Sequence, residues 1–89
     1  MPEMNVEQRI KEIMIERLFL KLTPDQIPDE MPIMEQLGVD SVQVFEIVVG
    51  LEEEYGISVG DDEFQIETYR TPHTIADYVR RKLTEKGAT

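Results

Sequence analysis

Apolar residues recur at helical intervals near the start of the chain. Four of them share one face of a helix: Val6, Ile10, Ile13 and Met14. Asn5 precedes this run, and Gln8 stands three residues after Asn5, which is the spacing of a capping box. The pattern predicts a first helix from about Val6 to Leu20.

The helical pattern then breaks at three prolines that stand four residues apart: Pro24, Pro28 and Pro32. A proline repeated at that interval is incompatible with a helix interior, because it lacks an N–H and its ring clashes with the preceding turn. The sequence therefore predicts a long extended connection. Three apolar residues along it are expected to pin it to the core: Ile27, Ile33 and Leu37.

A second helix is predicted from Ser41 to Tyr55, with Gly56 as its C-terminal stop. At 100° per residue, the core-facing arc holds Val44, Ile47, Val48, Leu51 and Tyr55. The opposite side holds Gln43, Glu46, Gly50, Glu53 and Glu54. Three more apolar residues lie on the flank between the two: Val42, Phe45 and Val49.

Two further helices are predicted after Gly56. A short one starts at residues 61–63, where three acids suit the positive end of a helix dipole. The last has Thr71 as its N-cap and Pro72 at its first position. Its apolar face is formed by Ile75, Tyr78, Val79 and Leu83. The predicted fold is all-α: a small four-helix bundle of three longer helices and one short helix, with a long first connection.

Length and composition limit the classes of function. One domain spanning residues 1–89 buries only about 60–65 % of its unfolded surface, so a deep catalytic cleft is not expected. The lack of cysteine excludes a disulfide scaffold, a thiolate nucleophile and a zinc–thiolate site. No apolar run approaches the ~20 residues that span a bilayer, and the first residues do not form a basic, apolar leader. A soluble, cytoplasmic protein without stable membrane insertion is expected.

The net charge of −10 is unevenly distributed. All Lys and Arg residues lie toward the two ends of the sequence, and the charged residues within 22–69 are all Asp or Glu. Such a surface repels nucleic-acid phosphates and steers basic protein partners toward itself. The simpler alternative is a solvated face that only keeps the protein in solution. The acids at 61–63 lack the alternation and the glycine of a calcium loop, so no dedicated metal site is expected.

Asp40 and Ser41 stand at the start of the second helix, and the residues alone leave three explanations open. Either side chain suits an N-cap. A nucleophilic serine needs a general base, for which the chain offers only His73, and the G-x-S-x-G elbow of hydrolases is missing. No catalytic residue is therefore expected. The third explanation is a point of covalent attachment.

The stretch "LGVDSVQVFEIVVGLEEEYGISV" resembles the acyl carrier proteins, whose signature is Leu-Gly-x-Asp-Ser-Leu at the start of an acidic amphipathic helix. The final "TPHTIADYV" extends the resemblance over nearly the whole chain. The resemblance implies that Ser41 is esterified by 4′-phosphopantetheine, whose terminal thiol carries an acyl group as a thioester. It also implies that Asp40 is recognised by the phosphopantetheinyl transferase, where it helps to bind that enzyme's metal ion.

The resemblance further implies that a monomer docks, through its second helix, on basic patches of acyl-loading, elongating or acyl-transferring enzymes. The candidates for electrostatic contacts are Glu46, Glu52 and Glu53. The candidates for apolar contacts are Val42, Phe45 and Val49. For these three the alternative is a place in the core, or in the lining of a pocket that shelters the acyl chain.

Several residues depart from the family pattern. Val42 and Gln43 replace the usual Leu and acid, Gln36 replaces an acid, and Gly50 replaces Ala at a cost of about 1 kcal/mol in helix propensity. They favour a specialised carrier, for a modified lipid or polyketide-type pathway, over the housekeeping fatty-acid carrier. An aminoacyl or peptidyl carrier is disfavoured by Val39–Asp40, because peptide-synthetase carriers tend to have Gly-Gly before the motif residues. The alternative from another class is an unmodified acidic helical adaptor for a basic protein.

An apolar stripe on the first helix is a further addition to the family pattern: Ile15, Phe19 and Leu22. We expect the long connection to fold back across it, with Met31 or Met34 covering Phe19. The alternative is a second contact surface or a larger acyl pocket, because exposed apolar patches tend to mark interaction sites.

Overall fold

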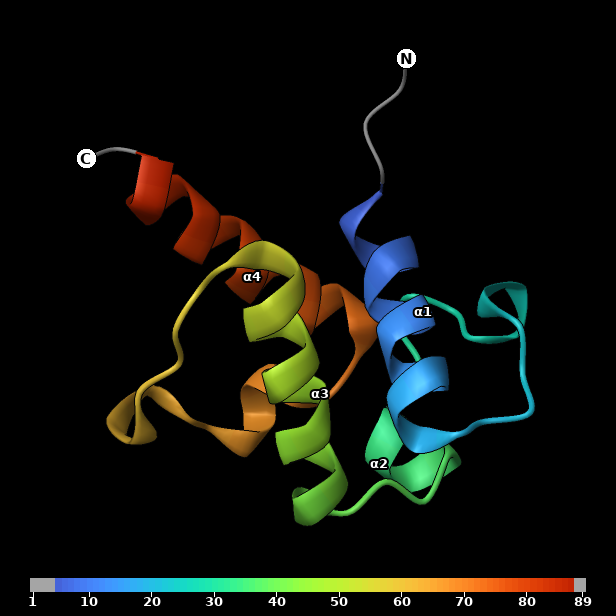
Figure 1. Ribbon diagram of the computed structural model, residues 1–89. Helices are drawn as coiled ribbons and strands as arrows, with labels where there is room; N and C mark the ends of the chain where they lie inside the picture. Colours follow the sequence, from blue (N-terminus) through green and yellow to red (C-terminus); the bar gives the residue numbers. More distant parts are fainter. Residues whose placement is uncertain (1–4, 88–89) are drawn as a thin grey trace.

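The computed structural model describes residues 5–87 and contains only helices and loops in that range (Figure 1). Its α-helices are α1 (Val6–Leu18), α2 (Ile33–Gln36), α3 (Ser41–Tyr55) and α4 (Pro72–Gly87). Three 3₁₀ turns lie between them: η1 (Pro24–Gln26), η2 (Asp61–Glu63) and η3 (Ile66–Tyr69). The all-α bundle with a long first connection is confirmed. None of the helices within residues 5–87 combines the length and apolar character needed to cross a bilayer.

Helix α1 begins where its capping residues predict and ends two residues early. The Asn5 side chain accepts the Gln8 N–H at 3.1 Å, as expected for the N-cap. At the other end Phe19 adopts the left-handed conformation (φ 56°, ψ 42°), and the Leu20 N–H turns back to the Ile15 carbonyl at 3.1 Å. This left-handed residue stops the helix at Leu18.

The connection between α1 and α3 is anchored to the core as predicted, but it is less extended than expected. Ile27 and Ile33 are fully buried, and Leu37 packs against the core. Two short helical segments, η1 and α2, form within it, and each has a proline at its start, a position that needs no N–H. The later short helix begins at Asp61 as predicted, but only as the 3₁₀ turn η2.

The three longer helices build the core. Helix α1 packs against both α3 and α4 (Figure 1). Helix α3 ends at Gly56, which has φ 65°, and α4 begins after Thr71, whose hydroxyl accepts the Thr74 N–H at 3.1 Å. Both boundaries are as predicted. Helices α1 and α3 run in opposite directions, so the end of α1, the short α2 and the start of α3 lie at one end of the bundle (Figure 1).

Gly50 marks the place where α1 and α3 come closest. The helical wheel assigned it to the polar side, but it is buried against α1. A Cβ atom at this position would lie 2.6 Å from Cγ2 of Ile13 and 3.2 Å from Nε of Arg17. The glycine is therefore required by the helix crossing, which offsets its cost in helix propensity.

The expected cover over Phe19 does not form. Its side chain is 88 % exposed, while Ile15, Leu22, Met31 and Met34 are half-buried. Phe19 is the left-handed residue at which α1 ends, so it does not continue the helical face of Ile15. The prediction that Met31 or Met34 covers the ring was therefore wrong.

Candidate functional site

The turn that leads into α3 is built by Asp40 and Gln43. Oδ1 of Asp40 accepts the Gln43 N–H at 2.9 Å, and the Gln43 side chain accepts the Asp40 N–H at 3.1 Å. This closed capping box satisfies two of the N–H groups at the helix start that lack partners within the helix, those of Asp40 and Gln43. Gln43, which departs from the family pattern, is thus the residue that completes the cap.

Ser41 is the first residue of α3, and its side chain is exposed. Within residues 5–87, its hydroxyl has no hydrogen-bond partner. The capping role belongs to Asp40 alone. The only histidine is also engaged elsewhere, because the His73 Nδ1 lies 3.6 Å from Glu7 and its Nε2 lies 3.4 Å from Asp77. A serine–histidine pair is therefore not formed, and the Ser41 hydroxyl is left open to another protein.

The segment before Ser41 is anchored to the core by two apolar side chains. Val39 is buried in the core, and Leu37 packs against it. Between them Gly38 has φ 68°, and a Cβ atom there would meet nothing within 4 Å. Glycine is therefore favoured at position 38 by its positive φ, and not by a lack of space for a side chain. This turn places Asp40 and Ser41 on the outside while the residue before them stays anchored.

The start of α3 also suits a phosphate ester. The first N–H groups of a helix lack partners within the helix, and the helix dipole favours negative charge there. Helix α3 has 15 residues, and Ser41 is its first. A phosphodiester on the Ser41 oxygen would therefore lie beside the positive end of the helix. The residues present fit such a group without any basic side chain.

The family model described as the phosphopantetheine attachment site matches residues 8–79. The chain belongs to this family. Domains of this family carry covalently attached 4′-phosphopantetheine, and the protein is a phosphopantetheine carrier. Such carrier domains are not themselves catalytic, and they interact with a phosphopantetheinyl transferase and with acyl-handling enzymes. The matched range contains the Asp40–Ser41 turn and all of α3.

Three apolar side chains of the carrier lie exposed along α3. Val42 is 71 % exposed, Phe45 is 51 % exposed and Val49 is 40 % exposed. The Phe45 ring stacks on Phe64 with centroids 4.6 Å apart, and Phe64 stacks on Tyr69 at 5.4 Å. We call Val42, Phe45 and Val49 the apolar stripe of α3. Its exposure argues against the core alternative, and the contact with Phe64 holds its middle residue in place.

The glutamates expected to dock on partners all have contacts within the carrier. Glu53 forms an ion pair with Arg17 of α1, and Glu46 lies 3.9 Å from the same guanidinium. The Glu52 side chain accepts the Val59 N–H at 2.8 Å, so it holds the segment after α3. The sequence analysis did not predict that Arg17 of α1 pairs with these glutamates of α3. The only local signal for it was the unusual glycine at position 50.

Other ion pairs of the carrier hold the helices together. Glu7 accepts two hydrogen bonds from Arg80, at 2.6 and 3.1 Å, and joins α1 to α4. These bonds hold the pKa of Glu7 below its ordinary value, against the opposite effect of burial. Glu63 binds Lys82 at 2.9 Å and Tyr78 at 3.1 Å. Among the described residues no cluster of acids and histidine has the arrangement of a metal site.

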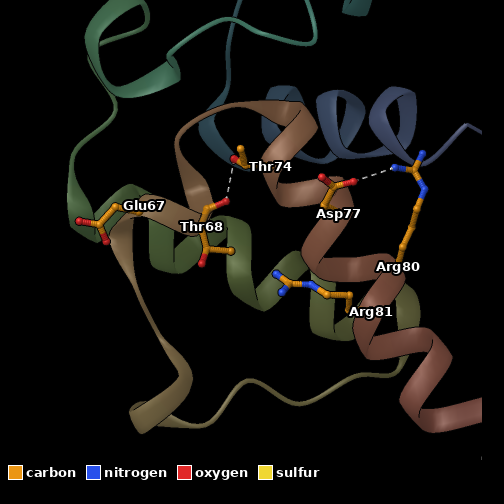
Figure 2. A pocket seen from close by; sticks show the side chains of 6 residues that line it. All are labelled: Glu67, Thr68, Thr74, Asp77, Arg80 and Arg81. Carbon is orange, nitrogen blue, oxygen red and sulfur yellow. Dashed lines mark hydrogen bonds and ion pairs between the residues drawn. The ribbon is translucent and has the colours of Figure 1, made fainter.

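A hollow of about 580 Å³ lies between η3 and α4. Figure 2 shows its lining: Glu67, Thr68, Thr74, Asp77, Arg80 and Arg81. The Thr74 hydroxyl donates to the Thr68 carbonyl at 2.9 Å, and Asp77 pairs with Arg80 at 3.5 Å (Figure 2). None of the predicted site residues lines this hollow. Its charged rim does not suit an apolar acyl chain.

Proposed function

We propose that the protein is an acyl carrier whose 4′-phosphopantetheine arm is attached to Ser41. The observation that supports this most directly is the exposed Ser41 hydroxyl, which has no partner among the described residues and opens α3 next to its cap. The family match covers this turn. The only other serine, Ser58, lies outside the regular helices in an unrelated loop. When bound, the arm supplies a terminal thiol that holds acyl groups as thioesters.

The attachment reaction gives Ser41 and Asp40 separate roles. The Ser41 oxygen forms a bond to the phosphorus that carries the pantetheine arm of coenzyme A, the pyrophosphate bond breaks, and adenosine 3′,5′-bisphosphate leaves. The serine proton passes to the transferase or to solvent. Asp40 uses Oδ1 for the cap, and the second oxygen of this exposed carboxylate is left for recognition by the transferase and its metal ion. Asp40 is therefore a recognition residue that also fixes the position of Ser41.

The proposed cargo is an acyl intermediate of a fatty-acid, modified-lipid or polyketide-type pathway. The departures at Val42, Gln43 and Gly50 support a specialised carrier with its own partner enzymes. An aminoacyl or peptidyl cargo is the second candidate, and Val39 before the motif disfavours it. The family match leaves the unmodified adaptor without support, because carriers of this family bear the prosthetic group.

Attachment is tested by incubating the apo-protein with coenzyme A and a broad-specificity phosphopantetheinyl transferase. We expect the intact mass to increase by one phosphopantetheinyl group, located by peptide mapping on the fragment that contains Ser41. Ser41→Ala should remove the increase and leave the fold unchanged, because Asp40 provides the cap. Ser58→Ala is the matched control and should be modified like the wild type. An unmodified wild type, or a modified Ser41→Ala protein, would reject the proposal.

A further inference from the structure

Arg17 lies in the last turn of α1, where this helix crosses α3. Its side chain is 30 % exposed, and its guanidinium contacts Glu53 and lies 3.9 Å from Glu46. Glu46, Gly50 and Glu53 follow one another at spacings of four and three along α3, so they share one side of the helix. The guanidinium thus lies over the glycine, between two acids of the same helix.

Gly50 is what allows this arrangement. A Cβ atom at position 50 would lie 3.2 Å from Nε of Arg17 and 2.6 Å from Cγ2 of Ile13. Because Ile13 is buried, its methyl group has little room to move, and α1 itself would have to shift. The contact between the arginine and the two acids therefore depends on two features of the sequence, Arg17 and Gly50.

On the exposed face of α3, the negative charge of the glutamates is partly offset by Arg17, and the apolar stripe is open to contact. Glu46 and Glu53 are exposed but already paired with Arg17. A partner that docks on these two acids through Lys or Arg competes with the Arg17 guanidinium. The apolar stripe of α3 lies open beside them, with Val42 directly after Ser41. The face therefore favours partners that supply apolar side chains.

We propose that Arg17 is a specificity-determining residue of the docking face. It acts as a built-in counter-ion for Glu46 and Glu53, disfavours enzymes that dock mainly through basic side chains, and favours those that contact the apolar stripe. This inference rests on the proposed function, since it concerns the enzymes that act at Ser41. Exposed ion pairs are individually weak, so Arg17 biases the choice of partner and does not block the face.

The test uses a phosphopantetheinyl transferase whose activity on the wild type decreases as salt is added, which identifies a partner that docks through charge. The initial rate of Ser41 modification gives kcat/KM for each variant. At low ionic strength Arg17→Gln should raise kcat/KM about three- to tenfold, the effect of releasing two acids from exposed pairs of modest strength. The difference should vanish near 1 M salt, where the screening length is about 3 Å.

Two variants control this experiment. Arg9→Gln removes the same charge from the same helix, but Arg9 pairs with Glu12 and Glu54 and not with the docking candidates Glu46 and Glu53, so its kcat/KM should change less than about twofold. Arg17→Lys keeps the charge and should remain near the wild type. Equal or slower modification of Arg17→Gln, or equal acceleration by Arg9→Gln, would overturn the inference.

A second pair of variants keeps the inference testable if Arg17→Gln does not fold. Glu53→Gln leaves Arg17 without its main partner and should slow modification more than Glu54→Gln, which releases Arg9. Equal rates for these two variants would count against the inference. A wild type that is not modified at all contradicts the proposed function instead, so the two failures are distinguishable.

Discussion

At the scale of single residues, Phe19 is the most unusual side chain of the protein. It is the only residue other than glycine with a positive φ in the described range, and its ring is almost fully exposed. A left-handed conformation costs an L-residue with a side chain about 1–2 kcal/mol, and no burial of the ring offsets that cost. A larger acyl pocket or a second contact surface that uses this ring stays a prediction.

Substitution of Phe19 measures this strain. Phe19→Gly should raise the free energy of unfolding by about 1 kcal/mol, because glycine adopts a positive φ without a steric penalty. Phe19→Ala should leave it nearly unchanged, because alanine keeps the Cβ atom and the exposed ring contributes little. Urea unfolding monitored by circular dichroism gives both values. A loss of about 3–5 kcal/mol in Phe19→Ala, as for a buried ring, would show that the ring is covered in solution.

At the scale of the elements, the sequence predicts a helix boundary correctly where residues next to that boundary determine it. Both ends of α3 were predicted from Asp40–Ser41 and Gly56, because a cap and a left-handed glycine act within one turn. The end of α1 was not, since a phenylalanine in the left-handed conformation has no sequence signature. Similarly, Ser41 was predicted as the attachment residue from its motif alone. The pairing of Arg17 with α3 could not be predicted in this way, because it depends on how two helices cross and a helical wheel describes only one helix.

The crossing at Gly50 has a consequence for stability. Gly50→Ala gains up to about 1 kcal/mol in helix propensity, but its Cβ would lie 2.6 Å from the Ile13 methyl. Overpacking of a core typically costs about 1–3 kcal/mol, so we expect a net decrease in the free energy of unfolding. Combining it with Ile13→Ala, which removes that methyl, should cost less than the sum of the two single changes. Additive or greater losses would show that the crossing is not tight.

At the scale of the whole molecule, ion pairs between distant segments hold a thin core together. Glu7 joins α1 to α4 through Arg80, Glu54 joins α3 to α1 through Arg9, and Glu63 joins η2 to α4 through Lys82. Each of these partners lowers the pKa of its glutamate below the ordinary value of 4.5. Two of these pairs join a basic residue from an end of the sequence, Arg9 or Lys82, to an acid of the segment 22–69, which has no Lys or Arg.

These lowered pKa values predict how stability depends on pH. A carboxylate whose pKa is lower in the folded state stabilises the protein above its unfolded pKa, and this contribution is lost as pH falls through the folded value. The free energy of unfolding should therefore fall as the pH is lowered below about 4.5.

Glu7 should contribute most, because its side chain is only 10 % exposed, and the groups that face it are Arg80 and His73, with Asp77 beside both. Glu7→Gln should cost about 1.5–3 kcal/mol at pH 7, the range for hydrogen bonds to a charged group, and should flatten the pH dependence below about pH 4.5. Glu63→Gln, which changes a more exposed carboxylate, should flatten it less. Urea titrations at pH 7, 4.5 and 3 measure the three proteins side by side, and a Glu7→Gln protein as acid-sensitive as the wild type would exclude this pair as the main source.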